Sequence, residues 1–282
     1  MFAHSEPLVE APRQKVLVAI PAFNEEKTVD YVLGRAAELK SGGAIWDFVL
    51  VNDGSTDRTV GIAKSMRAEV LDIRERAGKG NAILQGMLLA KKRGAEIFLM
   101  IDADLHRGFT KEQVNGILAE FELPPVCPDD PTSEAARRIG RKTEMVVHPW
   151  GEQNGGNYSY CTSYSGFRAI RMDALGFLFV KNPEGEWVFA KSKPAMRFIE
   201  AAQGYGLETI LNLYFRKRLR MICKSIGPAE ASEAIVKERD GRLPQGTQEH
   251  DLKKSRSLLN PRFNNWYDLV KKRGAQAVLA KQ

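Results

Sequence analysis

The sequence predicts one large α/β domain built on a mainly parallel, doubly wound sheet. Short apolar runs alternate with amphipathic helical stretches over about the first 105 residues, and three of these runs end in polar loops. The chain has 282 residues, of which 43% are hydrophobic and 27% charged, as expected of a globular protein with a substantial core. The strands should therefore be joined by right-handed helical crossovers.

Four apolar runs are the expected strands of the first half, at residues 15–20, 46–51, 70–73 and 96–101. The first should end at Pro21, because proline cannot donate to a sheet. Helical patterns occupy residues 28–39 and 82–92, and another helix should follow the polar turn at 52–57, with Ser55 or Thr56 as its N-cap. A short strand is expected at residues 145–147.

Two acids one residue apart, Asp102 and Asp104, end the strand at 96–101. If the strand pleat persists, both side chains project to the same side, where two carboxylates repel each other unless a cation lies between them. Their oxygens suit a hard divalent ion, Mg²⁺ or Mn²⁺, with open positions for substrate phosphates. The alternative is that one acid caps a helix and the other is solvated.

Polar side chains also follow the first two strands, with Asn24 and Glu25 after one and Asp53 after the next. Because the carboxyl ends of parallel strands meet at one edge of a doubly wound sheet, these loops and the Asp102 loop should form a single crevice. Simple turn chemistry is the competing explanation for Asp53-Gly54-Ser55. A nucleotide-binding P-loop and a dinucleotide fingerprint are both absent from the sequence.

Four short motifs in this half occur in the order found in family 2 glycosyltransferases. They are Pro21-Ala22-Phe23-Asn24-Glu25-Glu26, Val51-Asn52-Asp53-Gly54-Ser55-Thr56-Asp57, Gly78-Lys79-Gly80-Asn81-Ala82 and Asp102-Ala103-Asp104. The chain resembles that family over about residues 15–110. It also resembles the polyprenyl-phosphate sugar transferases and the glucosyl-3-phosphoglycerate synthases. The resemblance implies the GT-A fold, a nucleotide-diphosphate sugar donor (UDP- or GDP-sugar) and a divalent metal.

The resemblance also implies roles for particular residues. Glu25 and Asp53 would contact the nucleoside, with Asp53 accepting from the base, and Lys79 would lie near the nucleotide. Asp104 would hold the metal, with Asp102 nearer the ribose or sugar. The whole donor-binding set is Pro21, Ala22, Asn24, Glu25, Asp53, Gly78, Lys79, Asp102 and Ala103. The metal set is Asp104, Asp102 and His250, the last by analogy with the C-terminal histidine of some GT-A enzymes.

The acceptor side is expected in the second half of the chain. Glu208, with Asp102, is the candidate catalytic residue, and as a base Glu208 would deprotonate an acceptor hydroxyl, with Glu200 in reserve. Pairing with the basic run after it is the alternative for Glu208. Alternation in that run predicts an edge strand with Arg216, Arg218 and Arg220 on one face. Arginine forks suit a phosphate-bearing acceptor, although a solvated edge would look the same.

The expected domains are a tail at residues 1–14, a GT-A domain at 15–232 and a basic extension at 233–282. Within the GT-A domain, residues 15–110 form the nucleotide-sugar half and 111–232 the acceptor half. Residues 211–282 hold 16 lysines and arginines against 7 acids, whereas the net charge of the whole chain is +7. The C-terminal quarter therefore favours a phosphate-bearing partner, or is simply a solvated basic surface.

The expected location is the cytoplasm, with peripheral contact at the inner face of the membrane if the acceptor is a polyprenyl phosphate. Three widely spaced cysteines indicate neither a zinc site nor a disulfide framework, and the first 14 residues lack the apolar core of a secretory signal. A sugar-phosphate nucleotidyltransferase is the rival enzyme, but it would need a glycine-rich basic loop after the first strand. A further alternative is that the protein binds or glycosylates nucleic acid, and only the basic C-terminal region supports it.

Overall fold

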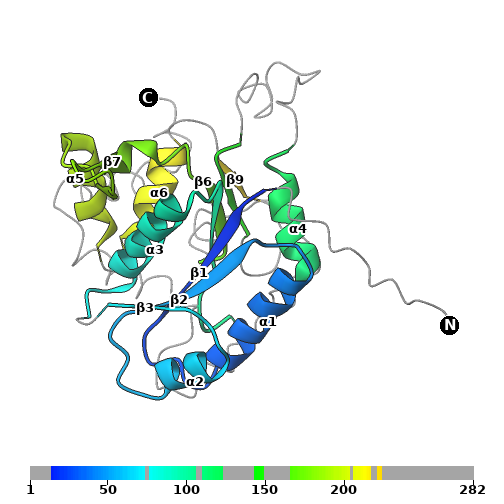
Figure 1. The fold of residues 1–282 in the computed structure, drawn as a ribbon. Coiled ribbons are helices and arrows are strands. Elements are labelled where there is room, and N and C mark those ends of the chain that lie inside the picture. The colour runs from blue at the N-terminus through cyan, green and yellow to red at the C-terminus, as the bar shows by residue number, and fades with distance from the viewer. Residues whose placement is uncertain are drawn as a thin grey trace, which may run out of the picture.

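The computed structural model describes residues 14–73, 76–105, 110–122, 143–148, 166–203, 206–216 and 221–223. Within these ranges the chain forms a seven-stranded sheet, in the order β3-β2-β1-β4-β6-β5-β9, and a separate two-stranded sheet, β7-β8. Helices cover both faces of the large sheet (Figure 1). The predicted α/β class with a mostly parallel sheet is confirmed.

The first four strands form the parallel half of the sheet. They are β1 (Val16–Ala22), β2 (Asp47–Asn52), β3 (Val70–Asp72) and β4 (Ile97–Met100). β1 pairs in parallel with β2 on one side and with β4 on the other. The chain therefore runs outward from β1 through β2 to β3 and then returns to the opposite side of β1. This change of direction is the topological switch point at which open α/β sheets bind ligands.

The second half of the large sheet is mixed. β6 (Arg168–Arg171) runs antiparallel to β4 and to β5 (Met145–Val147), and β9 (Met221–Cys223) runs parallel to β5 at the edge. A short 3₁₀ turn, η3 (Gly176–Leu178), leads into the hairpin of β7 (Phe179–Lys181) and β8 (Trp187–Phe189). The strand expected at residues 145–147 is present.

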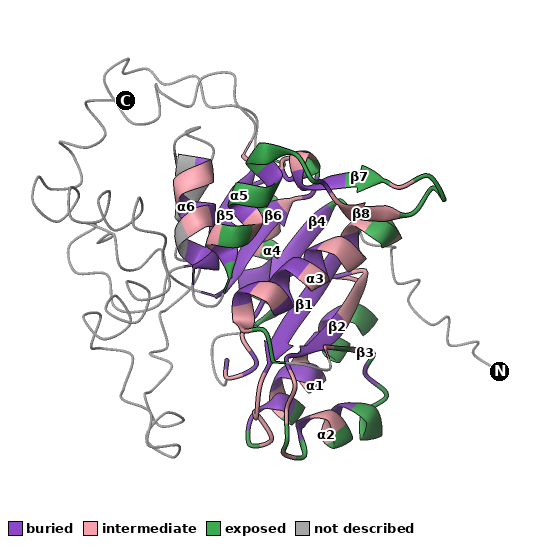
Figure 2. Ribbon diagram, turned by 90° about the vertical axis from the view of Figure 1, so that its left-hand side faces the viewer, coloured by how far each residue is buried: buried purple, intermediate pink, exposed green. Residues whose placement is uncertain are grey.

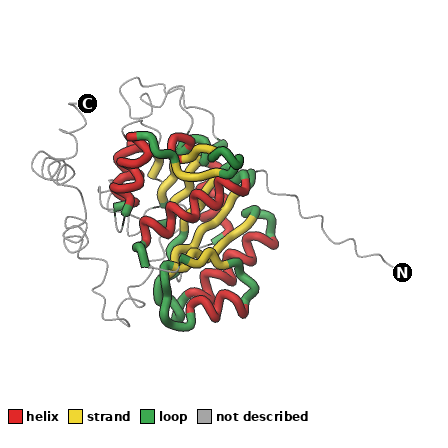
Figure 3. The backbone as a smooth tube through the Cα atoms, turned by 60° about the vertical axis from the view of Figure 1, so that its left-hand side comes forward, coloured by secondary structure: helices red, strands yellow, loops and turns green. Residues whose placement is uncertain are grey.

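Two apolar cores lie on opposite faces of the sheet, because side chains alternate along each strand. α1 (Val29–Ser41), α2 (Thr59–Ser65) and α4 (Lys111–Ala119) cover one face. α3 (Lys79–Arg93), α5 (Lys193–Ala202) and α6 (Leu207–Arg216) cover the other. Figure 2 shows the central strands buried between these layers, and Figure 3 shows the helices on either side of the strands. All seven residues of β1 are buried, as expected for a central strand.

The prediction that the first strand ends at Pro21 is wrong. β1 continues to Ala22, and Pro21 pairs in register with Val51 of β2. On its other side, β1 pairs with β4 only from Val16 to Ala19. Pro21 therefore lies beyond the part of β1 that pairs with β4. Its lack of an N–H does not cost the sheet a hydrogen bond there.

The expected N-cap of the second helix is also wrong. α2 begins at Thr59 rather than just after Ser55 and Thr56, and neither of those residues caps it. Asp57 instead accepts from the backbone N–H of Thr59 at 2.9 Å. Ser55 and Thr56 bond to the loop after β1, so a contact between loops has replaced the local cap.

The basic run begins in a helix instead of the expected edge strand. Residues 207–216 form α6, because Leu207, Leu211 and Phe215 recur at helical spacing and are fully buried. Arg216 is the last residue of this helix, and its side chain lies outside the described structure. The edge strand is β9, after the run, and residues 217–220, with Arg218 and Arg220, are outside the described residues.

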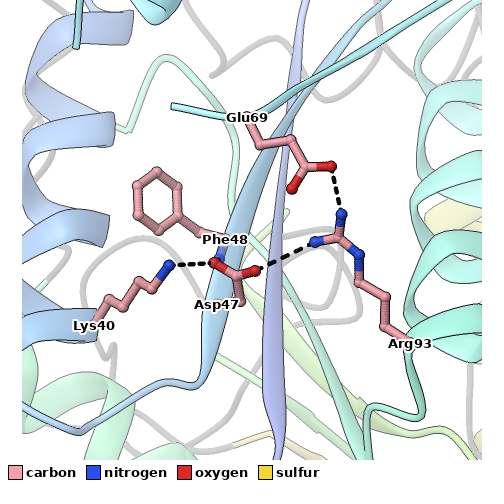
Figure 4. Close-up of polar contacts among 5 residues, drawn as sticks. All are labelled: Lys40, Asp47, Phe48, Glu69 and Arg93. Atoms are coloured by element: carbon pink, nitrogen blue, oxygen red, sulfur yellow. Dashed lines mark hydrogen bonds and ion pairs between the residues drawn. The ribbon is translucent and has the colours of Figure 1, made fainter. Parts of the chain in front are cut away.

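A cluster of ion pairs joins the two helical layers at the amino ends of the strands (Figure 4). Asp47, the first residue of β2, pairs with Lys40 of α1 at 2.7 Å and with Arg93 of α3 at 3.2 Å. Arg93 also pairs with Glu69. Because these side chains are partly exposed, the cluster should add little to stability, on the order of 1 kcal/mol or less per pair.

The packing of α3 on the sheet depends on a helical glycine. A Cβ on Gly86 would lie 3.1 Å from the Cβ of Ala19 and 3.4 Å from the Phe98 ring. We expect Gly86→Leu to reduce the free energy of unfolding by about 1–3 kcal/mol through overpacking. Urea denaturation measures this change.

Gly61→Ala is the control, because Gly61 lies on the exposed side of α2 with nothing within 4 Å of its Cβ position. This substitution should be neutral or stabilising by up to about 1 kcal/mol. A Gly86→Leu protein as stable as the wild type would contradict the described packing of α3 on β1 and β4.

Candidate functional site

The carboxyl ends of β1, β2 and β4 lie side by side, as the parallel pairing requires. Their loops carry the residues singled out in the sequence, namely Asn24 and Glu25, Asp53, and Asp102 and Asp104. The first turns of α3 and α6 reach the same edge, because Lys79 contacts Asp102 and Glu208 contacts Lys79. The expected gathering of loops is therefore present in the structure.

Backbone-to-side-chain bonds fasten the loop after β1 to the loop after β2. Asn24 donates its N–H to Ser55 Oγ at 3.1 Å and accepts from the N–H of Thr56 through Oδ1 at 2.8 Å. The N–H of Glu25 donates to Thr59 Oγ1 at 2.8 Å. Asn24 has a positive φ of 56°, a conformation that asparagine tolerates better than most residues. The two motifs thus form one structural unit.

Asp53 is buried, with 3% of its surface exposed, and it binds the loop that precedes α3. Its carboxylate accepts from the backbone N–H of Ala77 at 2.9 Å and of Gly78 at 2.9 Å. Gly78 has φ +89°, which a glycine adopts readily, and the helix begins at the next residue, Lys79. Asp53 therefore positions Lys79. Its contact with the nucleoside base stays a prediction.

Lys79 joins the two halves of the site. Its Nζ lies 2.8 Å from Asp102 Oδ1 and 2.8 Å from Glu208 Oε1. Burial would by itself lower the pKa of Lys79, but the opposing charges of Asp102 and Glu208 outweigh it, so the pKa lies above its ordinary value. The ammonium is therefore fully charged near neutral pH. Glu208 therefore forms an ion pair with Lys79. The alternative considered from the sequence was a pair with the basic run that follows Glu208.

The strand pleat does not continue through the two acids. β4 ends at Met100, and Asp102 accepts from the N–H of Leu105 through its backbone oxygen at 3.1 Å, which closes a turn. Ala103 is buried at 2% exposure, and Asp102 and Asp104 are partly exposed. The two carboxylates are therefore held by a turn and not by strand alternation.

Gly166 packs directly against Asp102. A Cβ on Gly166 would lie 2.0 Å from Asp102 Oδ2, so no larger residue fits without moving the carboxylate. Gly166 lies just before β6, which pairs with β4. The absence of a side chain at this position sets the orientation of Asp102 towards Lys79.

A second buried contact fixes the helix that carries Glu208. Arg168 of β6 is fully buried and donates to Oδ1 of Asn212, also fully buried, at 3.2 Å. Asn212 lies one turn after Glu208 on α6. Arg168 thus ties α6 to the sheet, and Glu208, at 7% exposure, is held beside Lys79.

Sequence reasoning missed three of these residues, Gly166, Arg168 and Asn212. An arginine within the otherwise apolar β6 and an asparagine at the i+4 position from Glu208 were the available signals. It also missed Arg76, whose guanidinium lies 3.9 Å from the centre of the Phe23 ring, beside the loop after β1.

The donor set of Asp102 and Asp104 fits a divalent metal in chemistry, because carboxylate oxygens are the ligands that Mg²⁺ and Mn²⁺ prefer. Among the described residues, no group of three or more histidines, cysteines and acids is placed to hold an ion. Remaining ligands would have to come from the substrate diphosphate or from elsewhere in the chain. His250 lies outside the described residues.

The other predicted site residues are placed as follows. Pro21 and Ala22 are buried at the end of β1, and Gly78 precedes α3, so these three would meet a ligand mainly through their backbone. Arg216 lies two helical turns beyond Glu208, roughly 12 Å along the axis at 1.5 Å per residue. The expected shared pocket of Glu208 and the arginines stays a prediction.

Gly166→Ala should displace the Asp102 carboxylate while the fold survives. A misplacement of about 1 Å at a reacting group costs on the order of 100-fold in rate, and a loss of that size is expected in the reaction proposed below. Circular dichroism and thermal unfolding check the fold, and Gly176→Ala, with nothing within 4 Å of its Cβ position, is the control. Wild-type activity in Gly166→Ala would show that the orientation of Asp102 is unimportant.

Several characterised proteins are similar to this chain. A dolichyl-phosphate beta-glucosyltransferase of Drosophila melanogaster is 36% identical over 110 residues, covering 34% of this chain and 33% of the relative. One from Trichomonas vaginalis is 33% identical over 209 residues, covering 64% and 61%. The polyprenol monophosphomannose synthase of Mycolicibacterium smegmatis is 31% identical over 108 residues, covering 36% and 40%. The chain thus spans between 33% and 61% of the length of these relatives.

Solved structures of glucosyl-3-phosphoglycerate synthase from Mycobacterium tuberculosis share the fold. The complex with phosphoglyceric acid matches with a TM-score of 0.53 and 17% identity, covering 88% of this chain and 82% of that one. The complex with Mn²⁺, UDP and glucosyl-3-phosphoglycerate matches with a TM-score of 0.53 and 18% identity over the same shares. This likeness supports the expected GT-A fold.

The sequence model of one family, described as glycosyl transferase family 2, matches residues 17–174. These residues are more than half of the chain and include all of β1 except Val16, together with α3, the Asp102 turn and β6. The match, the ordered motifs and the fold agree with one another. This chain therefore belongs to glycosyl transferase family 2.

Proposed function

We propose that this protein transfers a sugar from a nucleotide-diphosphate sugar, a UDP- or GDP-sugar, to a phosphate-bearing acceptor with the help of Mg²⁺ or Mn²⁺. The observation that carries the proposal is the convergence of Asp102, Lys79 and Glu208 at the switch point of the sheet. Membership of a glycosyltransferase family supports the reaction class. It favours sugar transfer over the rival nucleotidyl transfer.

On the donor side, the leaving nucleoside diphosphate must be stabilised as negative charge develops on it. Asp104 and Asp102 would hold the metal, which when bound neutralises the diphosphate. Lys79, the first residue of α3, adds a permanent positive charge at the same edge. The complexes of the solved neighbours with Mn²⁺ and UDP or with Mg²⁺ and UDP make such a donor plausible for this chain.

Recognition of the nucleoside is assigned to the fastened loops after β1 and β2. Asn24, Glu25 and Asp53 would supply side chains, and Pro21, Ala22 and Gly78 would supply backbone groups. Because the loops are already bonded to each other, nucleotide binding would cost little ordering of the backbone. Such preorganisation suits a site for a rigid purine or pyrimidine ring.

The acceptor side is assigned to Glu208 and the arginines after it. If the acceptor attacks through a hydroxyl, Glu208 would take its proton. If the attacking group is already a phosphate oxygen, no strong base is required. The names of the relatives include dolichyl phosphate and polyprenol monophosphomannose, and those of the solved neighbours include phosphoglyceric acid. A phosphate on the acceptor is the common chemistry, and Arg216, Arg218 and Arg220 are the proposed contacts.

The location of the protein follows from its acceptor in this proposal. A polyprenyl phosphate would bring it to the inner face of the membrane as a peripheral protein, and a small phosphorylated acceptor would leave it in the cytoplasm. Among the described helices, none has the length and apolar character needed to cross a bilayer. Vesicle co-sedimentation with and without polyprenyl phosphate would separate the two locations.

A thermal-shift screen of UDP and GDP, each with and without Mn²⁺, tests the donor side. A ligand of the folded state raises Tm, by an amount that corresponds to about 2.7 kcal/mol when its concentration is 100 times Kd. We expect one nucleotide to raise Tm only when metal is present, and Asp104→Ala to lose that shift while remaining folded. Asp173→Ala, an exposed acid after β6, is the matched control. Full activity in excess EDTA would refute the metal assignment.

Glu208→Gln tests the base. With a hydroxyl acceptor, we expect kcat to fall by about 10²–10⁴-fold, the usual contribution of general base catalysis, and the KM of the donor to change little. With a phosphate acceptor, the effect on kcat should be small. The exposed Glu200 of α5 was the reserve candidate, so Glu200→Gln serves as control and should be silent. A larger loss in Glu200→Gln than in Glu208→Gln would reverse the assignment.

A further inference from the structure

The ammonium of Lys79 has two anionic partners among the described residues. Its ion pairs with Asp102 Oδ1 and Glu208 Oε1 are both 2.8 Å long. The side chains of Asp102 and Glu208 are only 21% and 9% exposed, so water screens these pairs weakly. Lys79 therefore acts as the counter-ion of both carboxylates.

Oδ1 of Asp102 is buried and makes no hydrogen bond of favourable geometry within the described residues, although the ammonium of Lys79 lies 2.8 Å away. Oδ1 faces Lys79, and Oδ2 packs so closely on Gly166 that a Cβ there would lie 2.0 Å away. A divalent ion that approaches Asp102 must therefore compete with the ammonium for Oδ1 or lie beside it. Two cations at that separation repel each other strongly in a partly buried site.

The backbone around the cluster is held on both sides. The N-terminus of α3 is bound through Gly78 to Asp53, and α6 is bound through Asn212 to Arg168. The Lys79 side chain, by contrast, has four rotatable bonds and is 26% exposed. It is therefore the part of the cluster best able to move when a ligand binds.

The formal charges make such a movement favourable. Asp102 and Glu208 carry two negative charges and share the one ammonium of Lys79. A divalent ion compensates the excess, and a diphosphate that arrives with it presents new oxygens to the ammonium. A metal ion that binds alone would take Asp102 from Lys79 and leave the ammonium with one anionic partner fewer. A diphosphate that binds with the metal would supply a new anionic partner for the ammonium.

We propose that Lys79 is a built-in counter-cation that a metal–diphosphate pair displaces from Asp102, which couples metal binding to nucleotide binding and loosens the hold on Glu208. This inference rests on the proposed function. It makes Lys79 a positioning residue for Glu208 before the donor binds and a ligand of the diphosphate afterwards. The candidate base is then released only when a donor is in place.

The test is a binding cycle without any turnover. Free Mn²⁺ is measured by electron paramagnetic resonance in titrations of the wild type and Lys79→Met, each with and without the nucleoside diphosphate that stabilises the wild type in the thermal screen. Lys79→Met should bind Mn²⁺ alone about tenfold more tightly, because Asp102 is no longer occupied, and the gain in Mn²⁺ affinity on adding nucleotide should shrink about tenfold. Unchanged or weaker Mn²⁺ binding by Lys79→Met overturns the proposal.

Two further variants complete the test, one as a control and one as a substitute for Lys79→Met. Lys92→Met removes the same charge from the exposed far end of α3 and should leave both affinities unchanged, so an equal gain there would mean a general field effect and would overturn the proposal. Lys79→Gln can still donate to both carboxylates and serves if Lys79→Met does not fold; it should change Mn²⁺ binding in the same direction. Failure of the wild type to bind either UDP or GDP with Mn²⁺ would instead refute the proposed function itself.

Discussion

The double ion pair of Lys79 is the contact on which the candidate site depends, because it joins elements far apart in the sequence. Lys79 begins α3, Asp102 follows β4, and Glu208 lies in the first turn of α6. Without the ammonium, the carboxylates of Asp102 and Glu208 would lose the counter-charge that they share, a loss that costs several kcal/mol or shifts their protonation. The lysine thus holds together both halves of the domain at the edge where ligands are expected.

Around this contact, each functional side chain is held in place by a neighbouring residue. Asp53 holds the backbone before Lys79, and Gly166 sets the orientation of Asp102. Arg168 and Asn212 hold the helix of Glu208. A site built in this way keeps its reacting groups in place through rigid elements and buried bonds, as catalysis by positioning requires.

The dual position of Asp53 illustrates why a motif residue need not have one role. Its carboxylate has about four acceptor positions, and the two backbone N–H groups of Ala77 and Gly78 use only part of that capacity. Contact with a base and support of the loop before α3 are therefore compatible. Loss of Asp53 would affect both the nucleoside pocket and Lys79, so its substitution would not separate the two roles.

The sequence by itself determined the fold class, the parallel first half of the sheet and the residues at its carboxyl edge. These features are local, because apolar runs, helical spacing and polar loop residues act over a few positions along the chain. Only the tertiary structure decided that β1 passes through Pro21, that residues 207–216 form a helix and that Lys79 pairs with Asp102 and Glu208. The strand end and the ion pairs depend on where a distant segment packs, because β4 stops short of Pro21 and because Lys79, Asp102 and Glu208 come from separate elements. In α6 the spacing of Leu207, Leu211 and Phe215 was a local helical signal, and the alternation of arginines after it pointed to a strand instead.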